Sequence, residues 1–146
     1  MRGLALLLRW LHVLAAITWI GGMLFVALVL VPVTRRLEDA ALRTRLVQDT
    51  GRRFRTVGWI ALGVLVLTGI GNLLIAPYFL GNRRFHAKLL LVLVALGLAA
   101  LHDFWLGPRA GAPGADPVWR VRASWVARVN VLVVVAVVLL GLALRG

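Results

Sequence analysis

Six ionisable side chains lie within or at the ends of apolar stretches of this 146-residue chain, where a membrane would make charge costly. They are His12, His86, Lys88, His102, Asp103 and Arg128. A neutral imidazole can bind copper or haem iron, so the three histidines are the candidates for chemistry. The sequence has no cysteine and only two methionines, which excludes thiolate sites, disulfides and a methionine ladder for Cu(I).

The elements that position these residues must lie in a membrane. Hydrophobic residues make up 62% of the chain, more than a soluble domain of this size can bury. The net charge of +12 raises the question of nucleic acid. The arginines, however, flank apolar runs, where they would meet anionic lipid head groups. We therefore expect the lipid bilayer, and no nucleic acid, as the partner.

Four stretches are long enough to cross the bilayer as helices: about 10–33, 57–80, 85–106 and 124–144. The first is too long for the apolar region of a signal peptide, and we expect it to be retained. The predicted fold is an all-α integral membrane protein, a single four-transmembrane-helix bundle over residues 1–146.

Basic residues predict the orientation. The polar connector 34–55 holds seven arginines, softened by three acids, and is expected to form a short helix at the membrane surface. Ten arginines lie in this connector and the loop 107–122, against six basic residues on the opposite side. The positive-inside rule places the connector in the cytoplasm and both termini outside, in the inner (plasma) membrane.

Depth then groups the histidines. His12 and His86 are expected near the outer ends of two different spans, at similar depth. His102 lies 16 residues after His86, roughly 24 Å deeper, beside Asp103 and at about the level of Arg128. An Asp103–Arg128 ion pair would house both charges.

The first span has one face formed by His12, Ala15, Ala16, Trp19 and Met23 at helical spacing. Its small residues leave room beside the histidine for a flat macrocycle or for a closely packed helix. Other roles weigh equally. His86 fits an interfacial residue, His102 fits a structural pair with Asp103, and Lys88 fits a side chain that snorkels to the outer interface.

Three segments carry a family resemblance. "LHVLAAITWIGGMLFVALVLVP" (11–32) and "GRRFRTVGWIALGVLVLTGIGNLL" (51–74) resemble helices of the CopD copper-resistance membrane domain. "HAKLLLVLVALGLAALHDF" (86–104) also resembles the third helix of HemJ, the membrane protoporphyrinogen oxidase. CopD implies copper uptake or transfer. HemJ implies haem b and porphyrinogen oxidation, and points to His12, His86, Lys88 and His102.

The sequence thus leads to a hypothesis with two alternatives. The hypothesis is a haem b redox protein with His12 and His86 as axial ligands, His102 in reserve, and Lys88 and Trp19 as cofactor contacts. Its partner would be quinol or a porphyrin-type molecule, which makes an oxidoreductase conceivable. The alternatives are a CopD-like copper-handling protein using the same histidines, and a structural or assembly subunit. A homodimer is compatible with four short helices, although no motif specifies one.

Overall fold

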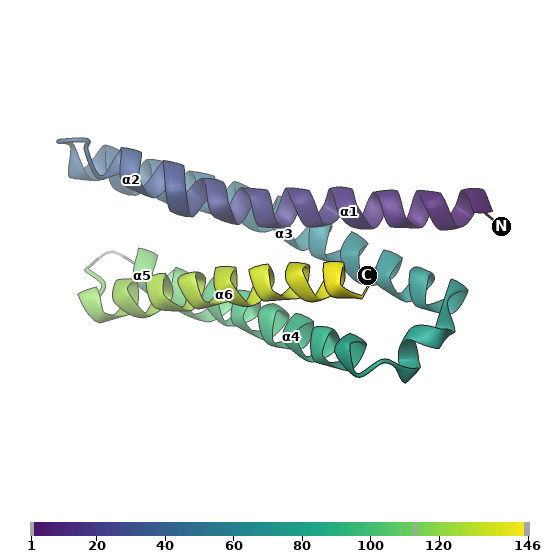
Figure 1. Cartoon of the computed structure of the whole chain (residues 1–146). Coiled ribbons are helices and arrows are strands. Elements are labelled where there is room, and N and C mark those ends of the chain that lie inside the picture. Colours follow the sequence, from purple (N-terminus) through teal and green to yellow (C-terminus); the bar gives the residue numbers. More distant parts are fainter. Residues whose placement is uncertain (1, 113, 145–146) are drawn as a thin grey trace. The chain divides into compact units, whose positions relative to one another are not determined.

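Every regular element in the computed structural model is a helix, over the described residues 2–112 and 114–144 (Figure 1). The elements are α1 (Arg2–Phe25), π-helical η1 (Val26–Leu30), α2 (Val31–Thr34), α3 (Ala40–Ile75), 3₁₀-helical η2 (Pro77–Gly81), α4 (Arg83–Ala100), π-helical η3 (Leu101–Leu106), α5 (Gly107–Gly111) and α6 (Pro117–Ala143). Four continuous helical stretches within these residues are long and apolar enough to cross a membrane: Arg2–Thr34, Ala40–Ile75, Arg83–Gly111 and Pro117–Ala143. The predicted all-α membrane fold with four spanning helices is therefore confirmed.

Side-chain caps define where three of these helices begin. Asp39 Oδ1 accepts hydrogen bonds from the amides of Ala41 and Leu42 at 2.8 and 3.1 Å, at the start of α3. Asn82 and Asp116 accept from the amides two residues ahead of them and cap α4 and α6 in the same way. Each cap satisfies an amide that has no partner within its helix.

The polar connector differs from its expected form. Its residues 40–55 are the first half of α3, which runs unbroken for 36 residues, and no separate helix lies there. Arginine is a good helix former, so this segment and the apolar part of α3 form one continuous helix. The helix ends at Ile75, because Pro77 disfavours helical conformation at the residue before it.

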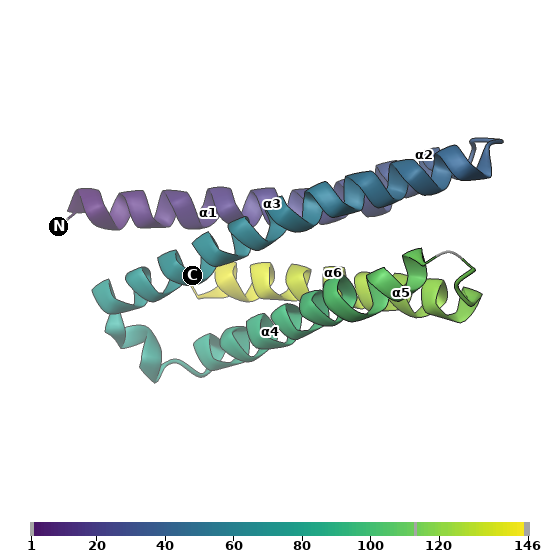
Figure 2. The same ribbon diagram turned by 180° about the vertical axis from the view of Figure 1, so that it is seen from behind.

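The chain divides into two compact units, Met1–Pro77 and Tyr78–Gly146. In the first unit α1 and α3 pack side by side as an antiparallel hairpin (Figures 1 and 2). The Phe54 ring occupies the place where a Cβ on Gly22 would stand. A Cβ on Gly58 would lie 3.5 Å from Trp19 Cδ1. Glycines thus form the holes into which aromatic rings pack, as small residues do between membrane helices.

The apolar stretches of α1 and α3 are offset from each other along this hairpin. The uncharged part of α3 runs from Thr56 to Ile75, about 30 Å. Gly22 on α1 already lies opposite Phe54, beyond that stretch. The apolar residues that follow Gly22, as far as Val33, therefore lie beside the arginine-bearing half of α3.

The second unit is also an antiparallel hairpin, of α4 and α6. Ala95 and Ala99 on α4 and Asn130 and Val134 on α6 are each less than 8% exposed. Small side chains on α4 let the two backbones approach closely. At one end of the hairpin, Arg84 Nη1 donates to the last-turn carbonyl of Ala143 at 3.1 Å. A cation there complements the negative end of the α6 dipole.

Candidate functional site

The strongest candidate for chemistry is a hydrogen-bonded pair inside the first unit. His12 on α1 is half-buried, and its Nδ1 lies 2.9 Å from Oγ1 of Thr68 on α3. Thr68 is 5% exposed. Its hydroxyl also lies 2.6 Å from the carbonyl oxygen of Val64, one turn earlier. The pair joins α1 to α3 through two residues that are 56 positions apart in the sequence.

The geometry of this pair selects one tautomer of His12. A carbonyl oxygen can only accept, and the Val64 contact at 2.6 Å is shorter than the His12 contact at 2.9 Å, so we assign the single hydroxyl proton of Thr68 to Val64. The hydroxyl oxygen must then accept from His12, which places a proton on Nδ1. In the neutral imidazole the lone pair is consequently on Nε2. Metal-binding histidines commonly have this arrangement, in which one nitrogen is fixed by an outer hydrogen bond.

Small residues keep the imidazole close to α3. A Cβ on Gly69 would lie 3.6 Å from His12 Cε1, and a Cβ on Gly71 would lie 3.1 Å from Leu8 Cδ1. Ala15, one turn along α1, is 7% exposed. The predicted room beside His12 is thus used by close helix packing.

The similar membrane depth expected for His12 and His86 stays a prediction. Thr68, the partner of His12, is seven residues from the end of α3 at Ile75, about 10 Å along the helix axis. His86 lies only three residues after α4 begins and is exposed. His12 itself lies ten residues (12 minus 2) after the start of α1, so the two histidines are at different distances from the starts of their own helices.

His86 and His102 also donate through Nδ1. Nδ1 of His86 lies 3.1 Å from the carbonyl oxygen of Asn82, which can only accept. Nδ1 of His102 lies 2.9 Å from the Asp103 carboxylate, the pairing that a structural role predicts. Each Nδ1 therefore donates a proton to its acceptor oxygen.

Lys88 and Trp19 lie in packing positions. A Cβ on Gly141 would lie 3.5 Å from Lys88 Nζ, so this glycine lets the ammonium approach the last turn of α6. Trp19 is 8% exposed and packs against Gly58 in the hairpin of the first unit. Arg128, the remaining ionisable candidate, has its guanidinium 5.5 Å from the ring centroid of Trp125.

Within each unit the histidines stand apart from one another. The first unit holds His12 alone, and sixteen residues of helix, roughly 24 Å, separate His86 from His102 in the second. Over residues 2–112 and 114–144 no group of three or more His, Cys, Asp or Glu side chains could hold a metal ion. The paired-histidine haem site stays a prediction without structural support.

Two polar residues had a significance that the sequence did not reveal. Thr68 reads as a small packing residue beside Gly69, and only the register of α1 against α3 makes it the partner of His12. Asn130 is 4% exposed, inside the apolar run of α6. A carboxamide in a spanning helix is a signal that a residue-by-residue search for charge passes over.

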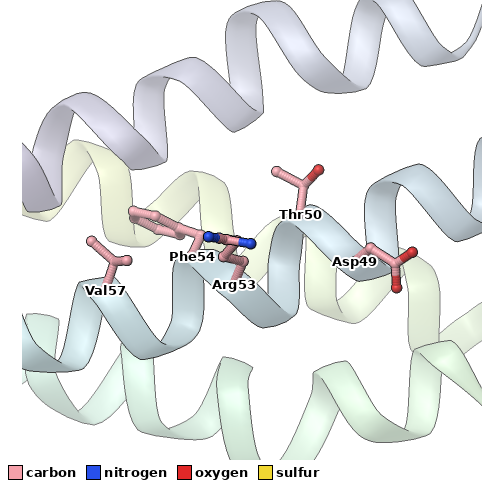
Figure 3. A pocket seen from close by; sticks show the side chains of 5 residues that line it. All are labelled: Asp49, Thr50, Arg53, Phe54 and Val57. Atoms are coloured by element: carbon pink, nitrogen blue, oxygen red, sulfur yellow. The ribbon is translucent and has the colours of Figure 1, made fainter.

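A shallow hollow of about 420 Å³ lies along α3 (Figure 3). It is lined by Asp49, Thr50, Arg53, Phe54 and Val57. None of the predicted site residues lines it, and its polar groups belong to the charged half of α3. It carries no chemistry that involves the histidines.

Comparison with known proteins places the chain in a family. The model of copper resistance protein D, CopD, matches residues 48–144. The chain belongs to the CopD family. A protein of Aquifex aeolicus (strain VF5), described as uncharacterized, is 33% identical over 142 residues, which cover 95% of this chain and 94% of that protein. No solved structure matches the chain.

The CopD match confirms the resemblance seen in the sequence, while none of these matches supports HemJ. The matched segment contains Thr68, His86, Lys88 and His102. His12 lies before it, on the helix that packs against the matched α3. Membership of this family indicates a membrane protein of the copper-resistance type.

Proposed function

We propose that this CopD-family protein handles copper in the inner membrane, with copper as its cargo. His12 is the proposed ligand, through Nε2. The observation that carries the proposal is the 2.9 Å contact between His12 Nδ1 and Thr68 Oγ1. With the Thr68 proton assigned to Val64, this contact keeps Nδ1 protonated and directs the lone pair to Nε2. Imidazole is a good ligand for copper, and a fixed tautomer prepares the ring for binding without a proton shift.

The other histidines have supporting roles in this proposal. With both termini outside, His86 lies at the outer start of α4 and is exposed, where an ion would first be met. His102 is held by Asp103 in the π-helical segment η3. Sparse single imidazoles give weak binding that releases the ion again, as transport requires and storage does not.

Copper content and copper movement test the proposal together. The purified protein is reconstituted into vesicles, and copper accumulation is measured for the natural chain, His12→Ala and His86→Ala. We expect His12→Ala to lose most of the accumulation and His86→Ala to lose less. Unchanged accumulation in His12→Ala, with the protein folded, would overturn the ligand assignment.

The haem b hypothesis, with electron transfer to quinol or a porphyrinogen, makes a different prediction. It requires iron and a porphyrin absorption band in protein expressed with ample haem, with sharp bands on reduction by dithionite. We expect copper binding and no such bands. A reduced spectrum of that kind, lost in His12→Ala, would replace copper handling by haem chemistry. Neither metal in the natural chain would favour a structural subunit.

A further inference from the structure

Arginine and tryptophan side chains gather where α5 and α6 meet in the second unit. Arg109 lies 4.2 Å from the ring centroid of Trp105 and 5.7 Å from that of Trp119. Arg122 lies 5.3 Å from the same Trp119 ring. We name these four residues the arginine–tryptophan cluster. Two guanidinium groups thus share one indole.

The cluster holds its cations in a way that leaves hydrogen-bond donors available for an anion. A guanidinium over an aromatic ring uses its flat face for that contact, while its N–H groups point outward in the plane. One of these donors, Nη1 of Arg109, is bonded to the carbonyl oxygen of Trp105 at 2.9 Å, which anchors the side chain. Planar N–H pairs match phosphate oxygens in a bidentate manner.

Charge at this end of the unit is unbalanced. Residues 105–122 contain Arg109, Arg120 and Arg122 against the single carboxylate of Asp116, a net charge of +2 (three minus one). Asp116 Oδ1 already accepts from the amide of Val118 as the cap of α6. Two guanidinium groups that approach one ring also repel each other, and a bound anion relieves that repulsion.

The position along α6 identifies the kind of anion. About 20 helical residues cross the hydrocarbon core, so a core that begins at Ala143 ends near Ser124. Arg122 and Trp119 then lie roughly 3 and 8 Å beyond it, inside the head-group layer. Trp105, which contacts Arg109 of the cluster, is 53% exposed, as expected for an interfacial tryptophan.

We propose that the arginine–tryptophan cluster is a binding site for the phosphate of an anionic lipid. Arg109 and Arg122 donate to the phosphate oxygens, and Trp119 holds the two guanidinium groups in place. The lipid tails lie along the apolar surface of α6. This site is separate from His12 and does not depend on copper handling.

The test compares lipids that differ in net charge. Full-length protein in detergent is titrated with phosphatidylglycerol or phosphatidylcholine, and bound lipid is counted by native mass spectrometry. We expect preference for phosphatidylglycerol, and roughly tenfold weaker binding in the Arg109→Gln/Arg122→Gln variant, the effect of losing one or two charge-assisted hydrogen bonds. Arg109→Lys/Arg122→Lys keeps the charge but loses the planar donors, and is expected to fall in between.

A matched control separates the cluster from general electrostatics. Arg35→Gln/Arg36→Gln removes the same charge from the turn between α2 and α3 and should leave the preference unchanged. An equal loss in this control, or no preference in the natural chain, would overturn the proposal. Displacement of phosphatidylglycerol by millimolar inorganic phosphate would also overturn it, since it would show a site for free phosphate. Helix content by circular dichroism verifies that each variant is folded.

Discussion

Three contacts converge on the hydroxyl of Thr68: the carbonyl oxygens of Val64 at 2.6 Å and Leu65 at 3.3 Å, and His12 Nδ1 at 2.9 Å. A hydroxyl has a single proton to give, and with that proton assigned to the Val64 carbonyl the hydroxyl oxygen accepts from His12 Nδ1. In the proposed copper site, this side chain thereby determines which nitrogen of His12 binds the ion, and Thr68 is a positioning residue.

Removing this hydroxyl should change both tautomer and copper binding. In Thr68→Val the Nδ1 proton loses its acceptor, and we expect copper affinity to fall about 10- to 100-fold, the usual effect of losing such an outer partner. Nitrogen-15 NMR of labelled histidine should report a mixed tautomer population for His12. Thr68→Ser keeps the hydroxyl and should retain the natural behaviour. Equal affinity in the Val and Ser variants would contradict this role.

The histidines could be found from sequence, but their surroundings could not. An imidazole in an apolar run is conspicuous wherever it occurs, so His12, His86 and His102 were evident as candidates. Whether Thr68 or another residue faces His12 depends on the register of two helices that are far apart in sequence. The packing of the imidazole against Gly69 depends on the same register.

At the scale of elements, the contact between α1 and α3 depends on Gly22. The Phe54 ring occupies the position of a Cβ on this residue. Gly22→Ala should force the ring to move and destabilise the hairpin by about 1–3 kcal/mol, as overpacking does in closely packed interiors. Thermal unfolding in detergent measures the effect.

Gly21 provides the matched control for this variant. It is the neighbouring residue of the same helix, and a Cβ there would meet nothing within 4 Å. Gly21→Ala should leave stability unchanged or raise it slightly, since alanine is the better helix former. A common midpoint for the two variants would show that the Phe54 ring yields without cost.

Arg84, on α4, caps the C-terminal end of α6. Removing its guanidinium should loosen the last turn of α6. In Arg84→Gln the charge near the Ala143 carbonyl disappears, which should cost about 0.3–1 kcal/mol locally. Amide hydrogen exchange should quicken over residues 140–143. Arg83→Gln, an exposed neighbour with the same change of charge, should not produce this effect. Quickening in both variants would indicate a general charge effect.

Hydropathy predicts which segments are apolar enough to cross a membrane better than it predicts where each helix begins and ends. The predicted stretches 10–33 and 85–106 lie within long helices, whereas 57–80 runs past the end of α3 at Ile75 and 124–144 ends one residue beyond α6. Each long helix nevertheless contains one apolar stretch, because burial in lipid requires both apolar side chains and helical backbone. The same signal cannot show that α3 begins at Ala40, since the hydrogen bonding of a helix continues through charged residues in water. The Asp39 cap was the available local signal for that start.

For the whole molecule, orientation in the membrane is a prediction that the absence of cysteine makes simple to test. Single cysteines can be introduced as Glu38→Cys, Ala112→Cys and Gly81→Cys without competing thiols. The positive-inside rule predicts that a membrane-impermeant maleimide added to intact cells labels only Gly81→Cys. Labelling of the other two variants instead would reverse the orientation. Inverted vesicles, in which the opposite set should react, provide the control.

The offset between α1 and α3 has a consequence for the lipids around the protein. A flat bilayer centred on the uncharged part of α3 leaves the apolar residues after Gly22 outside the hydrocarbon, and one centred on α1 immerses the α3 arginines. Neither helix can slide, because Phe54 and Gly22 lock their register. Such an offset is accommodated by a change in local bilayer thickness, by helix tilt or by snorkelling of the arginines, at a cost that grows with each ångström of mismatch. The length of the acyl chains in the surrounding lipids should therefore affect this protein.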